Sequence, residues 1–157
     1  MSVIHGMINK IYKYKKNMKS IVDYIYRRML VESVETSRKI EGLDGYDEGE
    51  VCEIIQNDIE SALDEAEFED YEIIEIWLHG SRLRGDAKDD SDLDAVMFYK
   101  GPAREDDLFN TLHDSYYFDC EIEDIKVDVN PIRIESDADI KKYKEKSDKY
   151  DQSKLKK

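Results

Sequence analysis

Residues 80–94, GSRLRGDAKDDSDLD, decide the fold of this chain because they join two segments with the composition of strands. The segment before them, 72–79 (EIIEIWLH), and the segment 92–99 (DLDAVMFY) are rich in β-branched and aromatic residues. Residues i and i+2 of a strand point to the same face, so Asp92 and Asp94 are expected to project together where the second strand begins. Two carboxylates on one face repel each other unless a cation lies between them.

The turn before these acids carries groups that suit a polyphosphate. Mg²⁺ takes oxygen ligands, commonly one or two carboxylates completed by phosphate oxygens and water. A glycine permits close approach of the backbone, a serine hydroxyl can bind a phosphate oxygen, and arginines match phosphate charge. The residues with these properties are Gly80, Ser81, Arg82 and Arg84, and Ser91 directly precedes the acids. The segment therefore predicts a site for Mg²⁺ and a polyphosphate.

Two other motifs with similar spacing are excluded. Residues 80–85 have the glycine spacing of a P-loop, but Asp86 and Ala87 stand where that loop has Lys and Ser or Thr. The Gly-x-Ser-x-Gly pattern of a nucleophile elbow is absent. A Gly-Ser turn alone is usually structural, and chance Asp-x-Asp pairs are expected among 38 acidic residues. The prediction therefore depends on the whole array.

A third carboxylate is needed if two metal ions are to stabilise both the attacking and the leaving oxygen of a displacement. Asp128 lies inside a third strand-like segment near 124–134, and its parity places it opposite Val127 and Val129. Asp124 has the same parity at the edge of that strand and is the rival. We predict Asp128 as the third ligand, and a solvated strand acid is the alternative.

The pattern of the remaining chain predicts an α/β (α+β) fold, a small mixed β-sheet with helices packed on it. Helices are expected at 7–40, 48–67, 103–114 and 137–150, a short helix or turn at 82–87, and a linker at 41–49. The corresponding organisation is an N-terminal helical extension at 1–46, a domain at 47–150 and a disordered tail at 151–157. Trp77 and Tyr99 are expected in the core. His79 is expected to be a structural histidine with a hydrogen bond, and the sequence assigns no role to His5 and His113.

Charge and composition restrict the partners. The chain of 157 residues has a formal charge of −14, with +6 in residues 1–31, +5 in 141–157 and −25 in 32–140. An acidic body disfavours nucleic acid as a partner, because phosphate backbones need a contiguous basic surface. Two cysteines are too few for a disulfide framework, and no apolar run is long enough to span a membrane. We therefore expect a cytoplasmic protein that does not contact a membrane. The composition is compatible with an oligomer.

The array at 80–94 resembles the nucleotidyltransferase signature of the DNA polymerase β superfamily, and most of all its minimal nucleotidyltransferases. The resemblance covers about residues 48–134. It implies that Asp92 and Asp94 hold Mg²⁺ on an incoming nucleoside triphosphate, while Asp128 completes a second metal site and helps ionise the acceptor hydroxyl. It further implies phosphate binding by Gly80 and Ser81, and by Arg82 or Arg84. Members of this group are often antitoxins paired with a helical HEPN ribonuclease toxin, and some add AMP to one of its tyrosines.

Three functions follow as hypotheses. The first is a Mg²⁺-dependent nucleotidyltransferase that moves AMP from ATP, or another nucleoside monophosphate from its triphosphate, to a hydroxyl group of a partner protein. The second is an antitoxin-like protein that neutralises its partner by contact alone. The third is a toxin that modifies RNA ends, which the acidic charge disfavours.

Overall fold

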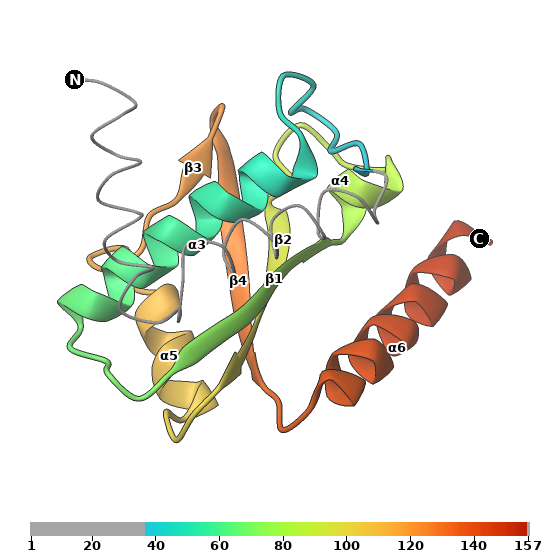
Figure 1. The fold of residues 1–157 in the computed structure, drawn as a ribbon. Coiled ribbons are helices and arrows are strands. Elements are labelled where there is room, and N and C mark those ends of the chain that lie inside the picture. Colours follow the sequence, from blue (N-terminus) through green and yellow to red (C-terminus); the bar gives the residue numbers. More distant parts are fainter. Residues whose placement is uncertain (1–36, 157) are drawn as a thin grey trace, which may run out of the picture. The chain divides into compact units, whose positions relative to one another are not determined.

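The computed structural model describes residues 37–156, which form a four-stranded sheet with helices packed on it (Figure 1). The described residues belong to one compact unit, Ser37–Lys157. The elements are α3 (Glu48–Glu65), β1 (Glu72–His79), α4 (Ser81–Arg84), β2 (Leu93–Lys100), α5 (Glu105–Leu112), β3 (Glu121–Ile122), β4 (Ile125–Arg133) and α6 (Asp137–Leu155). The mixed α+β fold predicted from the sequence is confirmed. Most of the helix predicted at 7–40 lies outside the described residues, and its last part, 37–40, is not helical.

The sheet has the order β1-β2-β4-β3. β1 and β2 are antiparallel neighbours, while β2 and β4 are parallel and are connected through α5. β3 was not predicted, because a strand of two residues carries no periodic signal. It pairs with β4 through a two-residue turn in which Glu123 and Asp124 have φ of 49° and 64°. Such left-handed turns match the twist of a hairpin.

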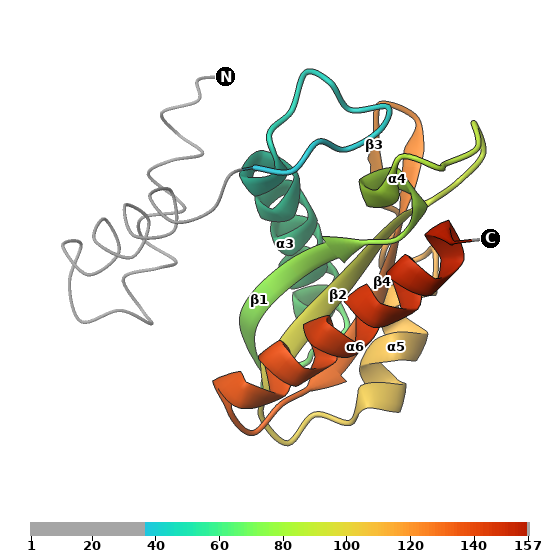
Figure 2. The same cartoon turned by 90° about the vertical axis from the view of Figure 1, so that its right-hand side faces the viewer.

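The side chains of β2 alternate between two apolar layers. One set packs with α3 and α5, and it consists of Leu93, Ala95, Met97 and Tyr99. The other set, Val96 and Phe98, packs with Trp77 and with Ile140 of α6. Figure 2 shows α6 across the sheet face opposite α3. Trp77 and Tyr99 are 8% and 0% exposed, so their predicted place in the core is confirmed.

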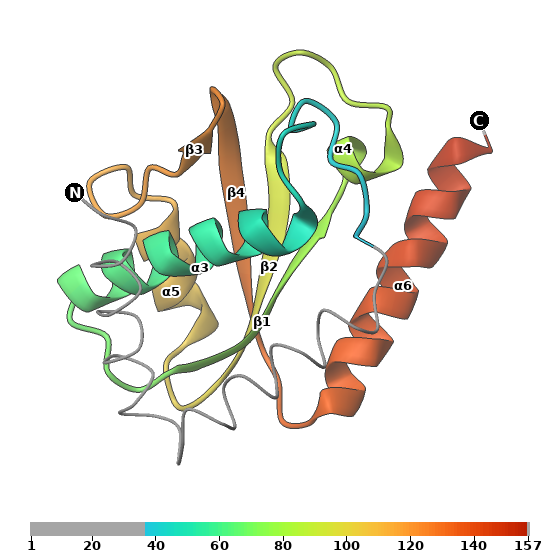
Figure 3. The same cartoon turned by 45° about the horizontal axis from the view of Figure 1, so that its top comes forward.

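Residues 37–46 belong to the sheet-containing unit, which corrects the predicted boundary at 46/47. Ile40 and Leu43 are each 1% exposed and lie in the apolar layer between the sheet and helices α3 and α5. The Glu41 N–H donates to the Arg82 carbonyl at 2.9 Å, so this segment is attached to α4. Figure 3 shows both at the same end of the sheet. The segment 41–49 is not a free linker, because the apolar side chains among its glycines pack into the core.

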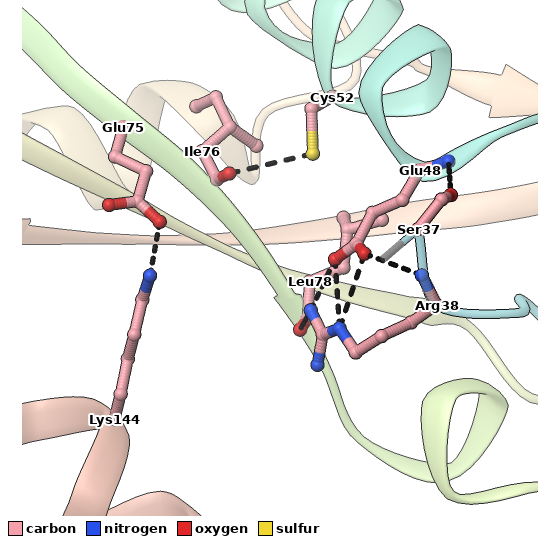
Figure 4. Close-up of polar contacts among 8 residues, drawn as sticks. All are labelled: Ser37, Arg38, Glu48, Cys52, Glu75, Ile76, Leu78 and Lys144. Carbon is pink, nitrogen blue, oxygen red and sulfur yellow. Dashed lines mark hydrogen bonds and ion pairs between the residues drawn. The ribbon is translucent and has the colours of Figure 1, made fainter. Parts of the chain in front are cut away.

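The outer edge of β1 is covered by side chains (Figure 4). Arg38 Nη2 donates to the Leu78 carbonyl at 2.8 Å, and Cys52 Sγ donates to the Ile76 carbonyl at 3.5 Å. Burial raises the pKa of the Cys52 thiol to about 12, so the thiol keeps its hydrogen for this contact. Arg38 is in turn held by hydrogen bonds to Glu48 in the first turn of α3. Capping in this way blocks strand addition at an exposed edge.

Helix α6 extends further than predicted. It runs to Leu155, so most of the segment 151–157 that was expected to be a disordered tail is helical. Its Asp151 makes a salt bridge of 2.7 Å with Arg84, a tertiary contact that a local sequence pattern does not reveal. Within residues 37–156, no helix combines the length and apolar character that a membrane crossing requires.

Candidate active site

The sheet register brings the predicted acids to one place. Asp94 of β2 is paired with Asp128 of β4 and, on its other side, with His79 of β1. Asp94 has the parity of Val96 and Phe98, so it lies on the sheet face that α6 covers. Asp92 precedes β2 by one residue and shares that parity. Asp124, the rival, lies instead in the β3–β4 turn.

Electrostatics identify Asp94 as the centre of this group. The side chain is partly buried, and burial is the main reason that its pKa is raised above the usual value. His79 opposes the shift, while the charges of Asp128 and Asp92 raise the pKa further. A desolvated carboxylate beside two like charges is relieved by a cation.

Gly80 lets the turn approach Asp94. Its φ of 86° and ψ of −163° are accessible to glycine and strained for other residues. A β-carbon at this position would lie 2.1 Å from Asp94 Oδ2, where ordinary contacts begin at 3.4 Å. The glycine therefore places the start of α4 directly against the Asp94 carboxylate.

The donor chemistry of the three acids suits Mg²⁺, but their side chains do not form a closed metal site in this structure. Among residues 37–156, no three acidic, His or Cys side chains form a group that could hold an ion. Asp128 instead lies 2.7 Å from His113, between Oδ1 and Nε2. The backbone thus brings Asp94 and Asp128 together, while the Asp128 side chain is bound to another partner.

Arg82 does not face the site. It is 5% exposed, and its guanidinium donates to the backbone carbonyls of Ser91 at 2.6 Å and Glu41 at 2.9 Å. A weaker contact of 3.4 Å reaches the Asp89 carbonyl. These bonds join the loop 85–92 to the segment 37–46. The expectation that Arg82 binds phosphate is therefore replaced by a structural role, because its donors already have acceptors.

Arg84 lies at the site but is paired. Its side chain is 14% exposed and bonds Asp151 at 2.7 Å and Asp86 at 3.1 Å. Ser91 accepts the Lys88 N–H through Oγ at 2.9 Å and so shapes the turn before Asp92. The Ser81 hydroxyl has no partner within the part of the chain that the structure describes.

Three residues beside the acids were not among the predicted site residues. His79 stacks on Trp77, with ring centroids 5.1 Å apart, in place of the hydrogen bond expected for it. Burial lowers the pKa of His79, against the opposing charges of Asp94 and Asp151. His113 and Asp151 come from the end of α5 and from α6. For His113 the sequence offers one weak signal, its spacing of four from Phe109 on a helix.

Comparison with known proteins agrees with this geometry. The family model described as a nucleotidyltransferase domain matches residues 59–152, more than half of the chain. The matched range contains the turn at Gly80, the three acids and most of α6. Neither curated proteins nor solved structures gave a match. The chain belongs to the nucleotidyltransferase domain family, whose chemistry is the transfer of a nucleotidyl group from a nucleoside triphosphate.

Proposed function

We propose that this protein transfers a nucleoside monophosphate, AMP by preference, from a nucleoside triphosphate to a hydroxyl group of a partner protein, with Mg²⁺. The observation that supports this most directly is the pairing of Asp94 with Asp128 beside Gly80. It puts two aspartates of adjacent strands next to a turn whose first residue has no side chain. That is a suitable arrangement for a metal-bound triphosphate.

In the proposed reaction, the acceptor oxygen forms a bond to the α-phosphorus. The bond from that phosphorus to the bridging oxygen breaks, and pyrophosphate leaves with the electron pair. In this proposal Asp128 would take up the hydroxyl proton, which then passes to water. Asp92 and Asp94, with Asp128, would hold two Mg²⁺ ions, which when bound neutralise phosphate charge. Positioning of this kind accounts for most of the catalysis that such transfers need.

Binding of the triphosphate should require the metal. The segment 32–140 carries a net charge of −25, which repels a polyanion. Arg84 is a cation whose charge acts on Asp94, and it would have to exchange a carboxylate for a phosphate. The Ser81 hydroxyl and the Gly80 backbone complete the proposed phosphate contacts.

A protein acceptor fits the charge around Asp128. Residues 105–128 hold nine acidic residues and one lysine. That surface would repel RNA and favour a basic partner, and a HEPN-type ribonuclease is our first candidate from the resemblance to minimal nucleotidyltransferases.

The two cysteines are free thiols, which supports a cytoplasmic location.

The test is transfer of label from each of the four nucleoside triphosphates to a candidate partner, with Mg²⁺ and with chelator. We expect transfer with Mg²⁺, none in chelator, and none with Asp94→Asn. Asp90→Asn removes an equal charge from the exposed loop before Ser91 and should stay active. Absence of transfer from all four nucleotides in Mg²⁺ would contradict the proposal. So would undiminished ATP binding in chelator.

Neutralisation by contact alone is the second candidate. It is favoured by one observation, that Arg84 and Asp128 are both engaged by internal partners in this structure. The combined change of Asp92→Asn and Asp94→Asn separates the two functions. If the variant still neutralises a toxic partner fully, contact suffices and the transfer is dispensable.

A further inference from the structure

His113 is held firmly at the end of α5. It is the C-cap residue of that helix, and its backbone N–H donates to the Phe109 carbonyl at 3.0 Å. Its ring Nδ1 lies 2.8 Å from the same carbonyl. The ring also stacks on the Phe109 ring, with centroids 3.9 Å apart and planes inclined by 23°. The orientation of the imidazole is therefore fixed by α5 itself.

The other ring nitrogen of His113 binds Asp128. Nε2 lies 2.7 Å from Asp128 Oδ1, and this contact links α5 to β4. A carbonyl oxygen can only accept, so Nδ1 donates to Phe109. Nε2 then faces a carboxylate oxygen, and so short a contact requires a hydrogen between these two atoms. The side chains of His113 and Asp128 are 33% and 49% exposed, so the bond is open to competition from solvent species.

The acids do not form a metal site as they lie. The register places Asp94 and Asp128 side by side, yet no three ligand side chains within residues 37–156 could hold an ion. We propose that His113 is a positioning residue that holds the Asp128 carboxylate away from Asp92 and Asp94 until a divalent cation competes for it. This inference rests on the proposed function, in which Asp128 is a metal ligand.

Two substitutions separate the bonds of His113. In His113→Asn the amide nitrogen can take the place of Nδ1 and keep the bond to Phe109, but it is too short to reach Asp128. In His113→Gln the longer side chain can take the place of Nε2 and keep a donor on Asp128. Because His113 is exposed, neither change should prevent folding, and thermal unfolding verifies this.

The experiment measures Mn²⁺ binding to the full chain by calorimetry without nucleotide. We expect His113→Asn to bind Mn²⁺ about fivefold more tightly than the unchanged protein, because one partly exposed charged contact no longer competes. His113→Ala, which lacks both bonds, should show the same gain, and His113→Gln should stay within about twofold. In an Asp128→Asn background, His113→Asn should have no effect, which is the signature of coupling between the two residues.

The outcomes distinguish this inference from the proposed function. If Asp128→Asn weakens Mn²⁺ binding but His113→Asn leaves it unchanged or weaker, the role of His113 is wrong and the metal site stands. If Asp128→Asn binds Mn²⁺ as well as the unchanged protein does, Asp128 is no ligand and both ideas fail. A gain that persists in the Asp128→Asn background also overturns the inference, since His113 would then act through another group.

Discussion

Replacing Gly80 with alanine tests whether the close contact between the α4 turn and Asp94 builds the site. The new β-carbon would lie 2.1 Å from Asp94 Oδ2 and 3.0 Å from its Cγ. Ordinary contact begins at 3.4 Å, so the carboxylate must move by more than an ångström or the turn must open. The first movement displaces the Asp94 carboxylate, and the second takes the start of α4 away from it.

The magnitude follows from two terms. A residue other than glycine at φ of 86° and ψ of −163° costs about 1–3 kcal/mol of unfolding free energy. Overpacking against Asp94 adds about 1–2 kcal/mol. We therefore expect Gly80→Ala to lose about 3 kcal/mol, and Tm to fall by roughly 10 °C for a domain of this size. A displacement of an ångström in a catalytic group lowers the rate by about 100-fold, so transfer should fall at least that far.

Two other glycines provide matched controls in denaturant unfolding and transfer assays. Gly85 has φ of 82° but nothing within 4 Å of its β-carbon position, so Gly85→Ala isolates the strain. It should cost about 1–2 kcal/mol and leave the transfer rate within a few fold. Gly45 has neither strain nor neighbours, and Gly45→Ala should be within about 0.5 kcal/mol. If Gly80→Ala and Gly85→Ala lose equal stability and equal activity, the contact with Asp94 does not build the site.

Further predictions concern the loop, the central acid and the domain boundary. Arg82→Lys should cost about 2 kcal/mol in denaturant unfolding and increase proteolysis of the loop 85–92, because an ammonium group cannot replace the bonds of the guanidinium to several carbonyls. Arg104 is the control: its side chain is 72% exposed, and Arg104→Lys should change neither the unfolding free energy nor the proteolysis. The pKa of Asp94 is higher in the folded protein than in the unfolded chain. In chelator, the protonated carboxyl therefore stabilises the fold at pH values below its pKa in the unfolded chain, and this stabilisation is lost as pH rises through its pKa in the folded protein. Asp94→Asn should therefore gain stability relative to the unchanged protein as pH rises from 4 to 7, and a difference that is flat with pH would refute the assigned cause. Ile40→Ala should lose about 3 kcal/mol of unfolding free energy if residues 37–46 belong to the core, and a loss below about 0.5 kcal/mol would return them to a linker.

Much of the fold could be predicted because its signals are local. The β-branched and aromatic composition of 72–79 and 92–99 predicted β1 and β2 within a residue of their observed bounds. The apolar stripe of α3 predicted a helix at 48–67, which ends at Glu65. The acids could be predicted from parity along single strands, since residues two apart share a face. Asp92, Asp94 and Asp128 needed no knowledge of neighbouring elements to be named.

The errors arose where a property depends on contacts distant in sequence. Arg82 and Arg84 are both cations two residues apart, and only the packing shows that Arg82 is buried on backbone carbonyls while Arg84 lies beside Asp151. The glycines of 41–49 suggested a linker, but Ile40 and Leu43 find a core contributed by other segments.

The sequence by itself determined the strand pattern and the set of carboxylates at the candidate site, because side-chain parity and composition are properties of short segments. Only the tertiary structure decided which partners those charged groups have, including the bond between His113 and Asp128. The physical reason is that burial and hydrogen bonding of a charged group depend on elements brought together by folding, and these contacts leave no periodic pattern in the chain.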